Sequence, residues 1–208
     1  MDALLTPSEG YVAELLAALW TVATISASRV LPGIYGTRSA HGAPLWRSAL
    51  STPTQWAVLP ACWMIDTPTS ERFFVYTFAL YMLVDFVITP LSKLLLLHHV
   101  FCLVGHFVVV LMLPATLPVY FAGVVTLELG SGFYNMFCLR PDVRWRVIAY
   151  AVGMSASNAA ALAICIRWVL LDIALAPKVL NLVITAIMVY LRQKTCYTNV
   201  AGSRAKHE

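Results

Sequence analysis

Charged residues are scarce in this sequence: Asp, Glu, Lys and Arg together make 12% of its 208 residues. Hydrophobic residues make 60%, and the mean hydropathy is +0.78. Soluble domains carry about 25% charged residues, so the composition excludes an ordinary soluble domain. The apolar stretches are about twenty residues long and are separated by short segments rich in Pro, Gly and charge. This pattern predicts transmembrane helices rather than the alternating strands of a barrel.

Disulfide frameworks, internal repeats and low-complexity segments are also lacking. The five cysteines are an odd number, scattered mainly through apolar runs, and form no set of pairs. The first ten residues contain no Lys or Arg, so the apolar run after them lacks the basic start of a cleaved signal peptide and is predicted to be retained. The net charge of +4 indicates no nucleic-acid partner, because the basic residues are sorted by side of the membrane.

Apolar segments divide the chain into predicted spans. The expected fold class is all-α: a polytopic membrane helix bundle of about seven transmembrane helices. The segments are 11–31, 45–65, 73–91, 94–113, 119–138, 147–166 and 173–191. The second is the least regular, because Pro53, Gln55 and Pro60 interrupt it. An alternative for this segment is an amphipathic stretch that lies in the membrane interface.

The distribution of Lys and Arg favours seven crossings. With seven spans and the N-terminus outside or lumenal, eleven of the fourteen basic residues lie on the cytoplasmic side, as the positive-inside rule requires. If 45–65 does not cross and the N-terminus is cytoplasmic, only eight basic residues lie on the cytoplasmic side and six lie on the other side. We therefore expect a lumenal N-terminus and a cytoplasmic C-terminus.

Two adjacent histidines, His98 and His99, interrupt a leucine-rich span. Polar side chains within a span mark a site or a structural hydrogen bond. Three interpretations stay open: a metal site, a hydrogen bond between helices, and a general base or covalent site. No metal is expected, because adjacent histidines cannot both bind one ion on a regular helix. His99, Cys102 and His106 fall on one stripe of the helix.

Other polar residues are expected at comparable positions on neighbouring spans. Asp85 precedes the turn at Lys93 by about 12 Å of helix, and the two histidines follow it by about 8 Å, so a carboxylate and an imidazole lie at similar depth. On segment 119–138, Glu128, Ser131 and Asn135 form one polar face. Gly130 and Gly132 beside them allow the close approach of a neighbouring helix or a lipid chain. Singly, each polar residue is explained by packing; together they indicate a functional pocket.

Four short motifs carry a resemblance. They are WRSALS at 46–51, YMLVDF at 81–86, LLHHV at 96–100 and LELGSGFYN at 127–135. In this order they resemble the TLC domain family of endoplasmic-reticulum-type membrane proteins, which includes the ceramide synthases. The resemblance covers 45–192 as a six-helix core. It leaves 1–44 as an extra N-terminal span with a basic loop, and 193–208 as a cytoplasmic tail.

The resemblance implies site residues and a substrate class. In ceramide synthases the paired histidines and aspartates serve N-acyl transfer from acyl-CoA. By resemblance the catalytic residues are His98, His99 and Asp85, acyl-CoA is the co-substrate, and no other cofactor is expected. The residues expected to contact membrane lipids or fatty acyl chains are Glu128, Ser131, Asn135 and His106.

The match to the synthases is incomplete. After the histidines the chain reads VFCLVGHFVVVLMLP and then GVVTLELGSGFYN, so two acids of the synthase motif are missing and only Glu128 stands in their region. This favours the smaller non-synthase members, whose implied roles are lipid metabolism, lipid homeostasis or acyl-lipid sensing. A non-enzymatic lipid-binding or cargo-trafficking adaptor is the alternative. The terminal RAKHE is similar to dibasic retrieval signals of the endoplasmic reticulum.

Overall fold

The computed structural model describes residues 11–36, 39–40, 43–89, 91 and 93–204. The retrieval signal expected in the last five residues lies outside this range except for Arg204. By internal packing the chain forms two units, 1–117 and 118–208, and each is described by itself. The divisions predicted at 44/45 and 192/193 remain predictions.

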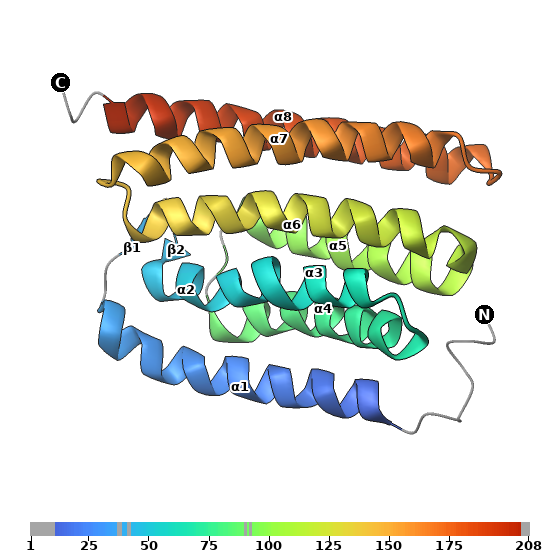
Figure 1. Ribbon diagram of the computed structural model, residues 1–208, viewed down its shortest axis with the longest axis horizontal. Helices are drawn as coiled ribbons and strands as arrows, with labels where there is room; N and C mark the ends of the chain where they lie inside the picture. The colour runs from blue at the N-terminus through green and yellow to red at the C-terminus, as the bar shows by residue number, and fades with distance from the viewer. Residues whose placement is uncertain (1–10, 37–38, 41–42, 90, 92, 205–208) are drawn as a thin grey trace. The chain divides into compact units, whose positions relative to one another are not determined.

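Unit 1 is helical apart from one pair of two-residue strands. Its elements are α1 (Val12–Tyr35), β1 (Ser39–Ala40), β2 (Ala43–Pro44), α2 (Leu45–Pro53), the π-helical η3 (Thr54–Val58), α3 (Leu59–Ile65), α4 (Pro68–Ile88), α5 (Lys93–Met112) and the 3₁₀ turn η4 (Pro114–Thr116) (Figure 1). The strands pair antiparallel, with Ser39 opposite Pro44. The helices predicted at the first four apolar segments are confirmed.

The segment that sequence patterns left uncertain is helical from Leu45 to Ile65, with a π-helical turn in its middle. Pro53 ends α2, and Pro60 stands in the first turn of α3. A proline inside a regular helix clashes with the carbonyl four residues earlier, and a wider π-turn is one way to relieve this. The prolines therefore reshape the helix locally without ending it.

A sharp reversal connects α3 to α4. Asp66 adopts a left-handed conformation with φ of 50° and ends α3. Thr67 then caps α4, because its Oγ1 accepts from Ser70 N at 3.2 Å and Ser70 Oγ accepts from Thr67 N at 2.8 Å. Pro68 occupies the first helical position, where its missing N–H costs nothing. These residues fix the direction in which α4 runs back.

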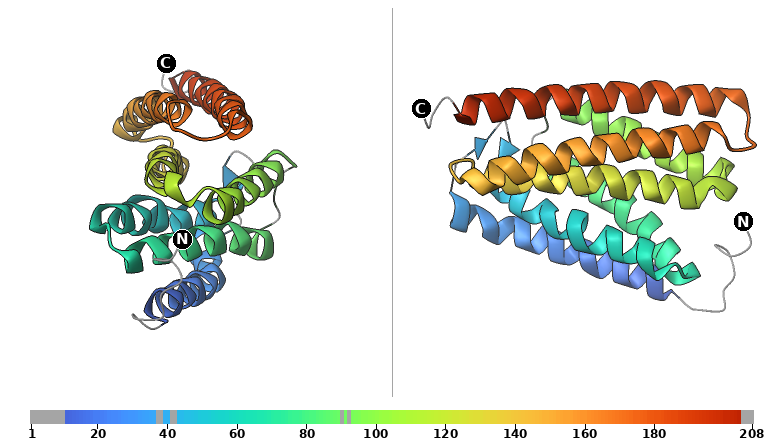
Figure 2. Two further views of the ribbon diagram at one scale, coloured as in Figure 1. Left: turned by 90° about the vertical axis from the view of Figure 1, so that its right-hand side faces the viewer. Right: turned by 45° about the horizontal axis from the view of Figure 1, so that its top comes forward.

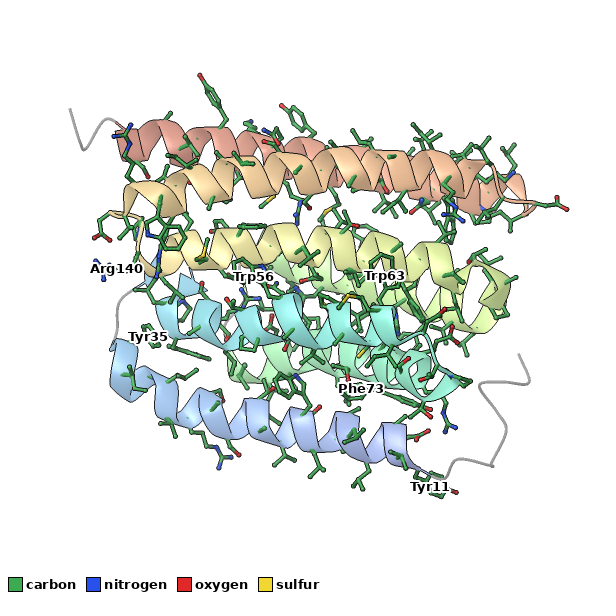
Figure 3. The ribbon with its side chains drawn as sticks, viewed as in Figure 1. Tyr11, Tyr35, Trp56, Trp63, Phe73 and Arg140 are labelled. Carbon is green, nitrogen blue, oxygen red and sulfur yellow. The ribbon has the colours of Figure 1, made fainter. Side chains whose placement is uncertain are left out.

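Side-chain pairs show how the helices of unit 1 are aligned. Glu14, near the start of α1, forms an ion pair with Arg72, near the start of α4, so these two helices run in the same direction. Arg47, at the start of α2, pairs with Asp85, near the end of α4, so 45–65 runs in the opposite direction. In Figure 3, Tyr11 and Phe73 mark the end at which α1 and α4 both begin, and Tyr35 marks the opposite end of α1.

Unit 2 contains three long helices: α6 (Leu117–Leu139), α7 (Arg144–Val169) and α8 (Leu175–Arg204). Helices α7 and α8 lie side by side in both views of Figure 2. The predicted positions of all three helices are confirmed, but the last predicted span ended at residue 191 and α8 continues to Arg204. Arg192 therefore lies inside a helix rather than at its end.

Among the described residues, five helices are long and apolar enough to cross a membrane. They are Val12–Tyr35, Leu95–Met112, Pro114–Leu139, Arg144–Val169 and Leu175–Ser203. Their outer faces are apolar: Leu111, Ile166 and Tyr190 are each more than 60% exposed. Such exposure is unusual in a soluble monomer but is compatible with an integral, multi-pass membrane protein.

Candidate functional site

Unit 1 contains a buried contact between Asp85 on α4 and His99 on α5. His99 Nε2 lies 2.9 Å from Asp85 Oδ2, and each residue is 2% exposed. The two residues meet because α4 and α5 run antiparallel through a short connection. The predicted proximity of Asp85 to the paired histidines is thus confirmed, and His99 is the histidine that makes the contact.

Arg47 completes this cluster, and sequence patterns missed it. Its guanidinium Nη2 donates to Asp85 Oδ2, the same oxygen that faces His99. The sequence places Arg47 at the start of the irregular segment 45–65, where a basic residue is expected to face the cytoplasm. Its side chain is only 13% exposed, since it is the third residue of α2 and lies between buried Trp46 and Ser48. The sequence could have indicated this contact. Arg47 lies at the start of one predicted span and Asp85 near the end of the next, and antiparallel neighbours bring such positions to the same depth.

Both ring nitrogens of His99 face hydrogen-bond acceptors. Besides the contact to Asp85, Nδ1 lies 2.9 Å from the carbonyl oxygen of Leu95. The two contacts fix the orientation of the ring between the Asp85 carboxylate and the Leu95 carbonyl. This geometry suits a residue that positions its neighbours better than one that accepts a proton or an acyl group.

His98 points to a different side of α5, as the 100° step between adjacent helical residues predicts. It is half-buried, and its ring meets that of His99 edge to face with centroids 5.5 Å apart. Both of its ring nitrogens lie 3.7 Å from Cys102 Sγ, one turn further along. His98 thus contacts the Cys102 thiol on its own helix, and its catalytic role stays a prediction.

His106 ties α5 to α4. It is fully buried, its Nε2 donates to the carbonyl of Val75 at 3.1 Å, and its ring packs on Phe78. His99 and His106 thus share the face toward α4, whereas Cys102 is half-buried beside His98. The contact of His106 with lipid or substrate stays a prediction.

The polar face predicted on α6 lies in unit 2. Glu128 and Asn135 are 7% and 6% exposed, so both are buried. Ser131 Oγ donates to the carbonyl of Leu127 and accepts from Arg192 Nη1 at 2.9 Å. The roles of Glu128, Ser131 and Asn135 in binding a lipid head group are predictions that these contacts do not test.

Arg192, which sequence patterns placed at the exit of the last span, links the three helices of unit 2. Nη2 donates to the carbonyl of Leu127 at 2.9 Å, and Nε donates to Asn158 Oδ1 at 3.1 Å. A Cβ added at Gly130 would collide with both the guanidinium and Ser157. The predicted close approach at Gly130 is thus confirmed, and an arginine makes it.

An Arg192→Met variant should lower the free energy of unfolding by about 2 kcal/mol, because hydrogen bonds between membrane helices contribute about 0.6 kcal/mol each and several are lost together. Thermal unfolding of the purified protein in detergent measures this. Lys194→Met is the matched control, since Lys194 is exposed on the same helix. Equal losses in both variants would contradict a role for Arg192 in holding the helices.

An open groove of about 500 Å³ lies elsewhere in unit 1. Apolar side chains form most of its wall, among them Leu16 on α1, Ala61 on α3 and Phe73 on α4. It lies near the starts of α1 and α4, whereas Asp85 lies near the end of α4. None of its lining residues is Asp85 or a histidine, so this groove provides no route to them.

Within the described part of the chain, no group of three or more His, Cys, Asp or Glu side chains is placed to hold a metal ion. Comparison with protein-family models, with curated proteins and with solved structures finds no match. The functional assignment therefore rests on the geometry of the site.

Proposed function

We propose that this chain is a seven-span, TLC-type protein of the endoplasmic reticulum or a related membrane that acts on lipid acyl chains, by acyl transfer from acyl-CoA or by acyl-lipid sensing. The observation that carries the proposal is the Arg47–Asp85–His99 cluster beside His98. Ionisable side chains are costly among apolar helices, and so many in one place exceed what packing requires.

In this mechanism the two histidines have different roles. Asp85 and Arg47 hold His99, and His99 fixes the segment of α5 that presents His98. His98 acts as the general base or acyl acceptor, since a neutral imidazole transfers protons near pH 7. The binding of a lipid head group by Glu128, Ser131 and Asn135 is a separate proposal for unit 2.

The direction of the helices supports seven crossings. Because α1 and α4 run in the same direction, the segment 45–65 between them must return along their length, as the Arg47–Asp85 and Glu14–Arg72 pairs require. A segment lying flat in the interface would leave α1 and α4 in opposite directions. Seven crossings place the two ends of the chain on opposite sides of the membrane. The sorting of the basic residues then makes the N-terminus lumenal and the C-terminus cytoplasmic.

Tags placed at the two ends of the chain should therefore lie on opposite sides of the membrane. In sealed microsomes, protease should remove a C-terminal tag and leave an N-terminal tag protected. Adding detergent is the control, because both tags should then be cleaved. Both tags cleaved in sealed microsomes would contradict the seven-span arrangement.

Lipid profiles of cells test the function itself. At matched protein level, His98→Ala should abolish the change in lipid composition caused by the wild-type protein, because loss of a general base costs about 10²- to 10⁴-fold in rate. Leu97→Ala, an exposed neighbour, is the control and should keep the effect. An inserted, folded His98→Ala variant with full effect would exclude chemistry at this residue.

A non-enzymatic lipid-binding or cargo-trafficking adaptor is the second candidate. The observation that favours it is that His99 and His106 both bind α4, as structural histidines do. For an adaptor, His98→Ala leaves the lipid profile unchanged, whereas His106→Leu lowers stability.

A further inference from the structure

The turn between α6 and α7 is strongly basic. Residues 140–146 read RPDVRWR, with three arginines and one aspartate. Only residues 140–143 separate α6 from α7, and both helices are long and apolar enough to cross a membrane. A turn this short stays at the membrane surface, so its arginines lie at the level of the lipid head groups. Arg140 marks this end of the two helices in Figure 3.

The start of α7 lacks the negative charge that stabilises the N-terminus of a helix. The free N–H groups there carry a partial positive charge, so acidic side chains are favourable at this end and basic ones are unfavourable. The first turn of α7 has no acidic residue and contains Arg144 and Arg146 instead. Its N-cap is Val143, whose side chain makes no hydrogen bond to the helix. Two arginines thus add to the positive end of the helix, which indicates that an anion from outside the chain neutralises them.

The one aspartate of the turn is already bound. Arg140 Nε and Nη2 donate to the two carboxylate oxygens of Asp142, at 3.2 and 3.1 Å. Both side chains are about 60% exposed, and this hydrogen bond lowers the pKa of Asp142. Asp142 therefore offsets the charge of Arg140 and leaves the charges of Arg144 and Arg146.

Trp145 and Arg146 form a prepared surface beside this turn. The Arg146 guanidinium lies over the Trp145 ring, 5.3 Å from its centroid, and its Nη1 donates to the carbonyl of Met136 on α6 at 3.3 Å. A side chain held in this way loses less conformational freedom when it binds a ligand. Trp145 is 57% exposed, and tryptophan is enriched at the level of the head groups.

We propose that Arg144, Arg146 and Trp145 bind the phosphate group of an anionic phospholipid, in the leaflet at the α6–α7 turn. Guanidinium N–H groups match phosphate oxygens in geometry and charge, and the start of α7 adds its own positive end. The inference does not depend on which reaction the protein performs. In the seven-span arrangement proposed above, this leaflet is the cytoplasmic one.

The other end of the same helices provides a matched comparison. Arg167 lies in the last turn of α7, where the helix dipole favours a cation, and Lys178 lies in α8 beyond the exposed Asp172. These two basic residues are therefore placed without the electrostatic conflict found at Arg144 and Arg146.

Lipid titration of the full-length protein in detergent micelles tests the proposal. Fluorescent phosphatidic acid, phosphatidylserine and phosphatidylcholine are added separately, and binding is measured by fluorescence anisotropy. The wild-type protein should bind the two anionic lipids about tenfold more tightly than phosphatidylcholine, and high salt should remove the difference. Arg144→Gln with Arg146→Gln should weaken the binding of phosphatidic acid about 25-fold, or about fivefold for each arginine. Asp142→Asn should strengthen it, because it removes a negative charge and frees Arg140.

The control is Arg167→Gln with Lys178→Gln, which removes two positive charges at the opposite end and should leave the affinity unchanged. An equal loss in this control overturns the proposal, because net charge alone then explains the binding. Thermal unfolding verifies that each variant is folded. If the Arg144→Gln, Arg146→Gln variant does not fold, Arg144→Gln alone alters an exposed side chain and should still cost about fivefold.

Two further results overturn the inference. One is an affinity for phosphatidic acid that stays at the wild-type value in every folded variant at Arg144 or Arg146. The other is displacement of the bound lipid by inorganic phosphate or free CoA at millimolar concentration, which assigns the arginines to a soluble phosphate instead of a lipid head group.

Discussion

Replacing Asp85 by Ala should lower the free energy of unfolding by about 3–5 kcal/mol, the cost of removing one member of a buried ion pair. Arg47 and His99 both contact one oxygen of this carboxylate, and their side chains are 13% and 3% exposed. Without Asp85, a buried guanidinium and an imidazole face one another. Unfolding of the purified protein in mixed micelles measures the loss.

Two comparison variants sharpen this test. Asp142→Ala removes an exposed carboxylate whose pKa is lowered by a hydrogen bond from Arg140, and it should leave the unfolding midpoint unchanged. A variant with Arg47→Met, Asp85→Leu and His99→Leu together should recover most of the stability, because a buried polar cluster can be exchanged for apolar packing at little cost. An Asp85→Ala variant as stable as the wild type would show that the cluster does not hold the helices.

Arg47 also changes how a test of catalysis must be designed. Apolar replacement of Asp85, His98 and His99 alone leaves Arg47 buried without its carboxylate, so loss of expression would say nothing about chemistry. Including Arg47→Met removes this problem. If this four-residue variant is as stable as the wild-type protein, a loss of its effect on lipid composition can be assigned to the histidines.

Gly130→Val should cost about 3 kcal/mol, at the upper end of what overpacking a core costs. Any Cβ at this position collides with the Arg192 guanidinium and with Ser157, so a branched side chain must separate α6 from α7 and α8. Thermal unfolding in detergent measures the effect. Gly105→Val is the matched control, because a Cβ there has nothing within 4 Å and it also lies inside a long helix.

A double-mutant cycle identifies the cause. If Gly130 is needed because Arg192 approaches it, Gly130→Val should cost clearly less in an Arg192→Met background than in the wild type. Equal costs in the two backgrounds would assign the effect to Ser157 or to the backbone instead.

Most helices were predictable because apolar stretches of membrane length have few other folded forms. The segment 45–65 was the exception, since Pro53 and Pro60 lower the sequence signal for a helix. The chain accommodates them with the π-turn of η3, which no propensity argument predicts. The end of α8 was also missed, because its polar last three turns resemble a tail in composition.

The candidate site was predictable where two residues flank the same turn. Asp85 and the histidine pair are separated by a short connection, so antiparallel helices place them at one depth. Arg47 and Arg192 are distant in sequence from the residues they bind. Their basic side chains lie near the ends of apolar runs, where the positive-inside rule predicts the cytoplasmic face and not a buried contact.

The amino-acid sequence alone determined that the chain is helical and membrane-compatible, and that polar residues are buried on three of its helices, because composition and the length of apolar runs decide these properties. Only the tertiary structure decided which histidine Asp85 binds, because a step of 100° sends neighbouring side chains to different partners. It also brought Arg47 to Asp85 and Arg192 to Gly130, because contacts between distant segments depend on the direction and rotation of whole helices.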